Sequence, residues 1–174
     1  QLAFHTISQA ADFQLSGPPT LLANGFDFSR YSFNPDPQPC LGWVGRIAPE
    51  KGLEDAAQVA AAQQWPLRVW GLKEDPDYAA AVEASVPAGT IEWRGFLPTE
   101  QLQRELGQCA VMLNTPKWNE AFGNVVVEAM ACGVPVVAYK RGGPAELIEA
   151  GLTGYLVPPD QPQALLEPVS YTHL

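Results

Sequence analysis

The chain has 174 residues, which is enough for one well-packed domain and too few for two ordinary ones. An apolar fraction of 47% and a charged fraction of 17% are typical of a globular protein rather than a disordered one. The formal net charge of −9 argues against a broad basic surface for nucleic acid or anionic membrane, so a phosphorylated ligand would need locally concentrated cations.

No apolar run reaches the roughly 18 residues that a membrane-spanning helix needs, and no signal peptide is visible. The three cysteines, Cys40, Cys109 and Cys132, are far apart and form no Cys-x-x-Cys pair. We therefore expect them to pack as apolar side chains, in a cytoplasmic setting, rather than to form disulfides or a metal site. His5 and His173 lie near the two ends, which leaves no histidine pair for zinc.

Residues 1–39 differ from the rest because five prolines break them into extended pieces and turns. We interpret this stretch as an interdomain linker or the remnant of a preceding domain, with a possible short strand over 20–24. From Cys40 onward, strands and helices alternate. Strands are expected over 41–45, 67–71, 90–93, 110–114, 134–138 and 154–157.

Spacing and capping residues predict the helices between these strands. Apolar residues recur at helical intervals from Leu53, and Asp75 followed by Pro76 is typical of a helix start. Further helices are expected over 99–107, 124–132 and 144–150. The alternation predicts an α/β fold over 40–168, namely a Rossmann-like, three-layer domain with a mainly parallel sheet.

The C-terminal end breaks this regular pattern. A helix is expected to begin at Gln163, but Pro168 should interrupt it. We interpret residues 169–174 as a non-native or disordered tail, and we expect the chain to be truncated at both ends.

Parallel sheets of this kind bind ligands at the carboxyl ends of their strands, beside helix N-termini. Arg46 directly follows the first expected strand, and Lys51 begins the next helix, so both should face that edge. Arginine offers phosphate a bidentate fork and lysine a mobile point charge, which makes the pair a candidate phosphate clamp. The alternative is two solvated surface cations.

A second strand-to-helix junction, like the one that carries Arg46 and Lys51, lies between residues 114 and 128. Asn124 is expected to cap the helix, while Gly123 lets a ligand approach the backbone closely. The free N–H groups of the first helical turn would then form an anion site. Glu120 and Glu128 would border it, and their natural partners are hydroxyl groups such as those of a ribose and a sugar. The alternative is a capping glutamate and an exposed helix glutamate.

Taken together, these motifs resemble the C-terminal domain of the retaining family-four glycosyltransferases, also called group 1. Members of that family have the GT-B fold of two facing Rossmann-like domains. The resemblance spans about residues 20–160 and rests on six segments in the family's order: Asn24-Gly-Phe-Asp27, Gly45-Arg46…Lys51-Gly52, Arg94-Gly95-Phe96, Glu120-Ala-Phe-Gly…Glu128-Ala-Met-Ala-Cys-Gly, Gly142-Gly-Pro-Ala-Glu146, and Gly151…Gly154…Val157-Pro158. Each segment alone is weakly specific, but the joint pattern is highly specific.

The resemblance implies transfer of a hexose from a nucleotide diphosphate sugar, UDP- or GDP-linked, to an unknown acceptor with retention of configuration. Arg46 and Lys51 would clamp the diphosphate and neutralise the leaving nucleotide, and Glu120 would accept from hydroxyls of the transferred sugar. The donor phosphate itself would take the acceptor's proton. No metal or other cofactor is implied. The donor would also contact Gly95, Phe96, Phe122, Gly123, Asn124, Val125 and, at the ribose, Glu128.

The acceptor would be held by the family's N-terminal domain, which also supplies a catalytic histidine in many members. His5 precedes the linker motif and does not match that histidine. We therefore expect the isolated chain to bind a nucleotide sugar without turning it over, with no nucleic-acid partner and no transmembrane segment. Peripheral membrane association of a longer protein stays open.

Two alternatives belong to other functional classes. The chain could be a nucleotide-binding module without catalysis, or a GT-B nucleotide-sugar epimerase, although the Glu120 and Glu128 pattern favours the transferases. A Rossmann dehydrogenase is disfavoured because no G-x-G-x-x-G follows a strand.

Overall fold

The computed structural model describes residues 3–171, and its centre is a six-stranded sheet in which all neighbouring strands are parallel. The strands are β3 (Gln38–Val44), β4 (Leu67–Trp70), β5 (Ile91–Gly95), β6 (Cys109–Asn114), β7 (Val136–Tyr139) and β8 (Gly154–Val157). They lie in the order β5–β4–β3–β6–β7–β8. The predicted strands are all present, and the parallel α/β fold is confirmed.

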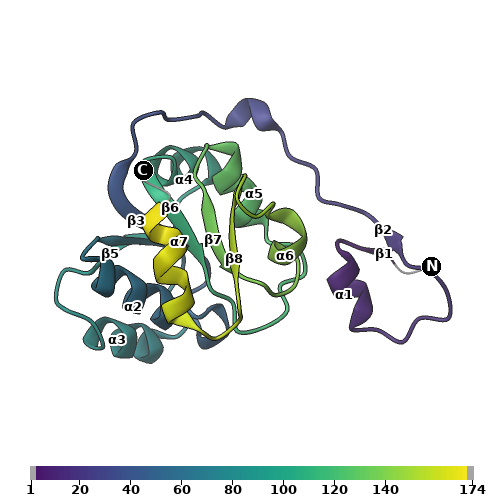
Figure 1. The fold of residues 1–174 in the computed structure, drawn as a ribbon, viewed down its shortest axis with the longest axis horizontal. Helices are drawn as coiled ribbons and strands as arrows, with labels where there is room; N and C mark the ends of the chain where they lie inside the picture. The colour runs from purple at the N-terminus through teal and green to yellow at the C-terminus, as the bar shows by residue number, and fades with distance from the viewer. Residues whose placement is uncertain (1–2, 172–174) are drawn as a thin grey trace.

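Helices cover both faces of the sheet (Figure 1). They are α2 (Leu53–Gln63), α3 (Pro76–Ala84), α4 (Thr99–Leu106), α5 (Asn124–Ala131), α6 (Pro144–Leu147) and α7 (Leu166–Tyr171), with 3₁₀ turns over Phe28–Arg30, Pro49–Lys51 and Pro162–Leu165. Helices α2, α3 and α7 pack on one face, and α4, α5 and α6 pack on the other. The domain therefore has the three predicted layers. Within residues 3–171, every helix is too short or too polar to span a bilayer.

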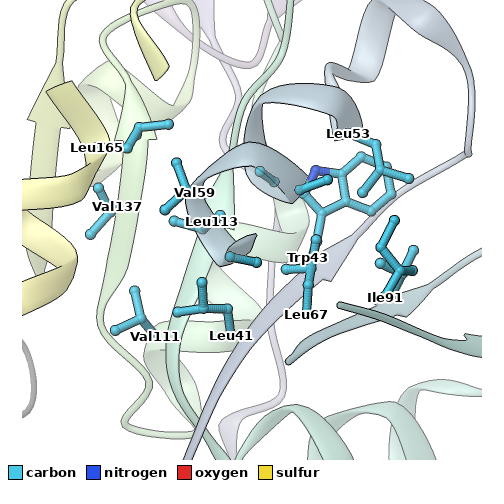
Figure 2. Close-up of a cluster of buried hydrophobic side chains, with 14 of the residues drawn as sticks. Leu41, Trp43, Leu53, Val59, Leu67, Ile91, Val111, Leu113, Val137 and Leu165 are labelled. Carbon is cyan, nitrogen blue, oxygen red and sulfur yellow. The ribbon is translucent and has the colours of Figure 1, made fainter. Parts of the chain in front are cut away.

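The larger core lies between the sheet and α2. Figure 2 shows Leu41 and Trp43 of β3 and Leu113 of β6 packed with Leu53 and Val59 of α2. These side chains come from the apolar positions that the sequence pattern assigned to strands and to one helix face.

The second core, on the α4 and α5 face, contains all three cysteines. Cys40, Cys109 and Cys132 are buried, as expected, and their thiols are free; the sulfur atoms of Cys40 and Cys109 lie 3.7 Å apart. Burial raises the pKa of the Cys132 thiol to about 11, which keeps it protonated at neutral pH. Within the described range, no group of three or more histidine, cysteine, aspartate or glutamate side chains could hold a metal ion.

The C-terminal helix α7 corrects two predictions. Pro168 does not interrupt it, because it is the third residue of the helix, where an N–H would lack an intrahelical acceptor anyway. The boundary expected at residue 169 is also wrong, since Val169 is fully buried and Gln63 of α2 donates to the carbonyl of Leu166 at 3.1 Å. The remainder of the predicted tail, with His173, lies outside the described residues.

An N-terminal arm, residues 3–22, extends from one side of the domain (Figure 1). It consists of β1 (Ala3–Phe4), α1 (Ile7–Ala11) and β2 (Thr20–Leu21), with β1 and β2 paired in parallel. The hydroxyl of Thr6 donates to the carbonyl of Ala121 at 2.7 Å, and the N–H of Ser8 donates to Glu146 at 2.6 Å. The stretch that we interpreted as a linker or remnant is thus attached to the domain beside α5 and α6.

Candidate functional site

The strand order reverses between β3 and β6, because β4 and β5 lie on one side of this pair and β7 and β8 on the other. At such a switch point the connecting loops diverge and leave a crevice at the carboxyl ends of the strands. Here the crevice has a volume of about 360 Å³. It is lined by His5, Asn24, Trp43, Val44, Gly45, Arg46, Lys51, Asn114, Pro116, Glu120, Ala121, Phe122, Gly123, Asn124 and Val125.

Lys51 and Glu120 form an ion pair in this crevice. The ammonium nitrogen of Lys51 lies 2.7 Å from a carboxylate oxygen of Glu120, and both side chains are mostly buried, at 16% and 19% exposure. The ammonium also lies 5.0 Å from the centre of the Trp118 ring, within the range of a cation–π contact. The two residues that the sequence placed at separate junctions are therefore in direct contact.

Arg46 follows β3 and lies at the edge of the crevice. Its guanidinium donates to Glu50 at 2.9 Å and to Glu74 at 2.5 Å, and its side chain is about half exposed. Exposed ion pairs of this kind contribute only about 0–1 kcal/mol. A bidentate phosphate could therefore replace either carboxylate at little cost.

Buried hydrogen bonds join the loops that carry Lys51 and Glu120. The indole N–H of Trp43 donates to the hydroxyl of Thr115 at 3.3 Å, and that hydroxyl donates to the carbonyl of Gly52 at 2.7 Å. The Lys117 N–H donates to the carbonyl of Glu50 at 2.9 Å. These contacts fix the two loops relative to each other.

Helix α5 begins at the crevice, but not with the predicted cap. Gly123 is the N-cap, with φ at 94°, a left-handed conformation that suits glycine. Asn124 is instead the first helical residue, and its side-chain oxygen accepts from the Asn24 amide at 2.6 Å. Because the first N–H groups of a helix lack intrahelical acceptors, the lining by Gly123, Asn124 and Val125 places an anion-binding end at the crevice.

Phe122 also connects the domain to the N-terminal part of the chain. Its ring stacks on Phe26 with centroids 6.2 Å apart and meets the His5 ring edge-on at 6.3 Å. The adjacent carbonyl of Glu120 accepts from the Gly143 N–H at 2.6 Å. The loop before α5 is therefore held from both the N-terminal arm and the β7–α6 connection.

Phe96 lines a second, apolar cavity of about 180 Å³ beside the crevice. Phe96 is 66% exposed. Gly95, the last residue of β5, precedes it with φ at 72° and lines neither cavity. The two cavities share Val44, Gly45 and Arg46. The second cavity is lined by Val44, Gly45, Arg46, Trp70, Gly71, Leu72, Phe96, Leu97 and Leu102.

Glu128, the fifth residue of α5, is half-buried and lines neither cavity. Burial raises the pKa of its carboxyl, and a bond from the Tyr31 hydroxyl at 3.4 Å lowers it to a smaller extent. One long hydrogen bond leaves most of the carboxylate's acceptor capacity unused.

Several lining residues were missed at the sequence level. Trp43 is the next-to-last residue of β3, and Asn114 is the last residue of β6. Asn24 reaches the crevice and bonds Asn124, which lies 100 residues further along the chain. Asn114 carried a usable signal, because it is an amide at the end of an otherwise apolar strand.

The six parallel strands, the crevice at the point of reversal and the helix N-terminus beside it define a Rossmann-like domain with a crevice at its switch point. Sequence comparison identifies the family. The profile described as "Glycosyl transferases group 1" matches residues 27–171, so the chain belongs to this family.

Two relatives that are named as glycosyltransferases agree with this family assignment. A GDP-mannose-dependent alpha-mannosyltransferase of Mycolicibacterium smegmatis is 35% identical over 145 residues, covering 83% of this chain and 37% of that protein. A 2-deoxystreptamine N-acetyl-D-glucosaminyltransferase of Streptomyces fradiae is 34% identical over 134 residues, covering 71% of this chain and 31% of that protein.

Among solved structures, the Anabaena protein HepE in complex with UDP-glucose superimposes with a TM-score of 0.83 at 28% sequence identity. The match covers 97% of this chain and 52% of that one. The chain thus spans about half the length of this structure and about a third of the two named relatives.

Proposed function

We propose that the chain is the donor-binding domain of a glycosyltransferase that transfers a hexose from a UDP- or GDP-linked sugar to an acceptor with retention of configuration. The observation that carries the proposal is the Lys51–Glu120 pair beside the N-terminus of α5. A cation and free N–H groups suit a diphosphate, and the adjacent carboxylate suits sugar hydroxyls. A relative named as GDP-mannose-dependent and a similar structure holding UDP-glucose support a donor of this class.

In this proposal the diphosphate lies between the first turn of α5 and the cations Arg46 and Lys51. When the bond between the anomeric carbon and the diphosphate oxygen breaks, negative charge develops on the leaving diphosphate. The two cations and the helix N–H groups stabilise that charge. The acceptor oxygen bonds to the anomeric carbon on the same face, and its proton passes to the departing diphosphate oxygen.

The remaining contacts follow from the two cavities. Glu120 accepts from hydroxyls of the transferred hexose, and the base occupies the apolar cavity beside Phe96. Glu128 accepts from the ribose, which would use the lone pairs that Tyr31 leaves free. Phe122 and the α5 residues Asn124 and Val125 shape the walls of the crevice, and Gly95 sets the direction of the chain before Phe96.

The acceptor, in the same proposal, is held by a part of a longer protein, and the isolated chain binds the donor without turnover. We also propose that binding needs no metal and that the protein is cytoplasmic. Glycosyl transfer by the isolated chain would contradict the assignment of acceptor binding to another part of a longer protein.

Calorimetric titration with UDP and with GDP, each with and without a chelator, tests the site directly. The expected result is weak binding of at least one nucleotide, unchanged by the chelator. If neither nucleotide binds, the site assignment fails.

Substitutions then test the individual roles. Arg46→Ala and Lys51→Ala should each weaken binding of the diphosphate by about tenfold to a hundredfold, the value of a charge-assisted hydrogen bond. Lys73→Ala is the matched control, because the Lys73 ammonium lies over the Trp93 ring and the residue lines neither cavity. If all three variants bind the nucleotide as tightly as the unsubstituted chain, Arg46 and Lys51 are surface cations without a role in phosphate binding.

Glu120→Gln separates the sugar from the nucleotide. It should not weaken UDP binding, because the carboxylate that competes with phosphate for Lys51 is gone. It should abolish any extra affinity that UDP-glucose has over UDP. A loss of UDP affinity would instead assign Glu120 to the nucleotide.

A further inference from the structure

Asn114 is the last residue of β6 and the one amide in a strand of sequence Cys-Ala-Val-Met-Leu-Asn. It is only 8% exposed, yet it lines the crevice. Its side-chain oxygen is buried and accepts no hydrogen bond from any residue of the range 3–171. A strand end in this position therefore carries an acceptor that the chain itself does not use.

Buried polar atoms normally have hydrogen-bond partners, since an unpaired one costs stability. Among the described residues, the other such atom is the indole nitrogen of Trp93, which borders neither cavity. An apolar side chain at position 114 would pack the strand end without this cost. The amide is therefore better explained by a group that arrives from outside and donates a hydrogen bond.

The fold indicates where that group lies. Asn114 and Met112 are two residues apart on one strand and share a face, and Met112 packs with Val126 and Ala129 of α5. Met112 is paired with Gly42 in β3, so Asn114 lies level with Val44. Val44 lines both cavities, and Asn114 is thus near their junction.

A nucleotide that spans the two cavities must place its ribose at this junction, because the ribose connects the base to the diphosphate. Phosphate oxygens have no hydrogen to donate, whereas ribose hydroxyls do. The amide oxygen and nitrogen are nearly equal in size, so a half-turn of the amide can present the acceptor to the crevice.

We propose that Asn114 accepts a hydrogen bond from a ribose hydroxyl of the bound nucleotide, as a binding residue additional to Glu128. This inference rests on the proposed function. It gives the strand end beneath α5 a role in holding the sugar ring of the nucleotide, separate from the roles of the cations in holding its phosphates.

The test uses the 174-residue chain with the nucleoside diphosphate, UDP or GDP, that binds it more tightly. Asn114→Ala should weaken its binding by about fivefold to tenfold, the value of a neutral hydrogen bond. The same substitution should have no effect on whichever analogue, 2′-deoxy or 3′-deoxy, lacks the bonded hydroxyl. Equal losses with the parent nucleotide and both analogues would overturn the proposal.

Asn114→Val guards against a simple folding defect. It removes the unpaired oxygen and favours a strand, so the melting temperature should rise while nucleotide affinity falls. Trp93→Phe is the matched control, because it removes the other unpaired polar atom and should leave affinity unchanged. A purely structural asparagine would show no loss of affinity in Asn114→Val.

The ligand series locates the contact. Equal losses for the nucleotide and for its sugar-linked form support a ribose contact, whereas a loss seen only with the sugar-linked form would overturn it. If the unsubstituted chain binds no nucleotide, both the proposed function and this inference fail. If it binds and the Asn114 variants bind equally well, only this inference fails.

Discussion

At the level of single residues, Glu128 illustrates a carboxylate whose burial opposes its ionisation. Burial raises its pKa above the ordinary value of 4.5. The folded state therefore holds the proton more tightly than the unfolded chain does. The stability contributed by this carboxyl falls as pH rises from the unfolded-state pKa to the higher folded-state pKa. At neutral pH the full penalty is present, which is compatible with a residue kept for binding.

Glu128→Gln should therefore raise the melting temperature at pH 7, by about 2 °C, while weakening UDP binding by about tenfold. The difference in melting temperature should shrink as pH falls below 4.5, because the carboxyl then becomes protonated in both states. Thermal melts across this pH range check the sign, with Glu83→Gln on the exposed side of α3 as the control. A wild-type affinity in Glu128→Gln would remove this residue from the ribose site.

Gly52 shows how one backbone position supports the crevice. Its φ of 65° is left-handed, and a Cβ there would overlap the carbonyl oxygen of Thr115. Gly52→Ala should cost more than about 3 kcal/mol, because a rigid backbone clash adds to the conformational cost. Gly89→Ala should cost only about 1 kcal/mol, since Gly89 has a similar φ of 84° with open space around it. Urea unfolding of both variants measures the difference, and equal costs would refute the steric argument.

At the level of elements, a buried charged network joins the loop after β6 to the first turn of α2. The Lys117 ammonium bonds the carboxylate of Asp55, which is 5% exposed, and the Tyr139 hydroxyl donates to the same carboxylate at 2.5 Å. Burial alone would lower the pKa of Lys117, but Asp55 and the nearby carboxylates of Glu54 and Asp160 raise it overall. The ammonium thus stays charged and holds the two elements together.

Lys117→Met should destabilise the domain by about 3–5 kcal/mol, because it leaves the Asp55 carboxylate buried without its cation. Lys140→Met, at an exposed position, should change stability by less than about 0.5 kcal/mol. Because this side-chain network holds the loop that leads to Glu120, nucleotide affinity should fall together with stability. Chemical unfolding and calorimetry on the same samples check both effects, and an unchanged midpoint would rule out the network as a structural support.

The order and type of the elements could be predicted from the sequence, because apolar runs bounded by glycine, proline and asparagine are local signals. Strand β8 has the predicted bounds, and Asp75 caps α3 as expected. The start of α5 near residue 124 could be predicted, but its cap could not, since the Asn124 side chain is engaged by Asn24 from a distant segment. The pairing of Arg46 with Glu74 also depends on tertiary placement. Local patterns thus locate a site's loops, but not the partners of its charges.

At the level of the whole molecule, the N-terminal arm is attached to α6 through one carboxylate. Glu146 of α6 accepts from the N–H groups of Ile7 and Ser8 at 3.0 and 2.6 Å, and from the Ser8 hydroxyl at 2.5 Å. Burial works to raise the pKa of Glu146, but these hydrogen bonds lower it overall. The folded state therefore favours the carboxylate, and docking of the arm should depend on its ionisation.

Because the folded pKa of Glu146 is lowered, its stabilising contribution is complete above the ordinary value of 4.5 and is lost as pH falls through the lowered value. Glu146→Ala should expose the amides of Ile7 and Ser8 and speed their hydrogen exchange on the order of tenfold at neutral pH. In the unsubstituted chain the same amides should lose protection only below pH 4.5, after correction for intrinsic rates. Glu149→Ala, at an exposed position after α6 in the chain, should leave their exchange unchanged. Core amides of β6 should stay protected in every variant, because the arm contributes no strand to the six-stranded sheet. A general loss of protection would mean that the arm is an integral part of the domain rather than docked on it.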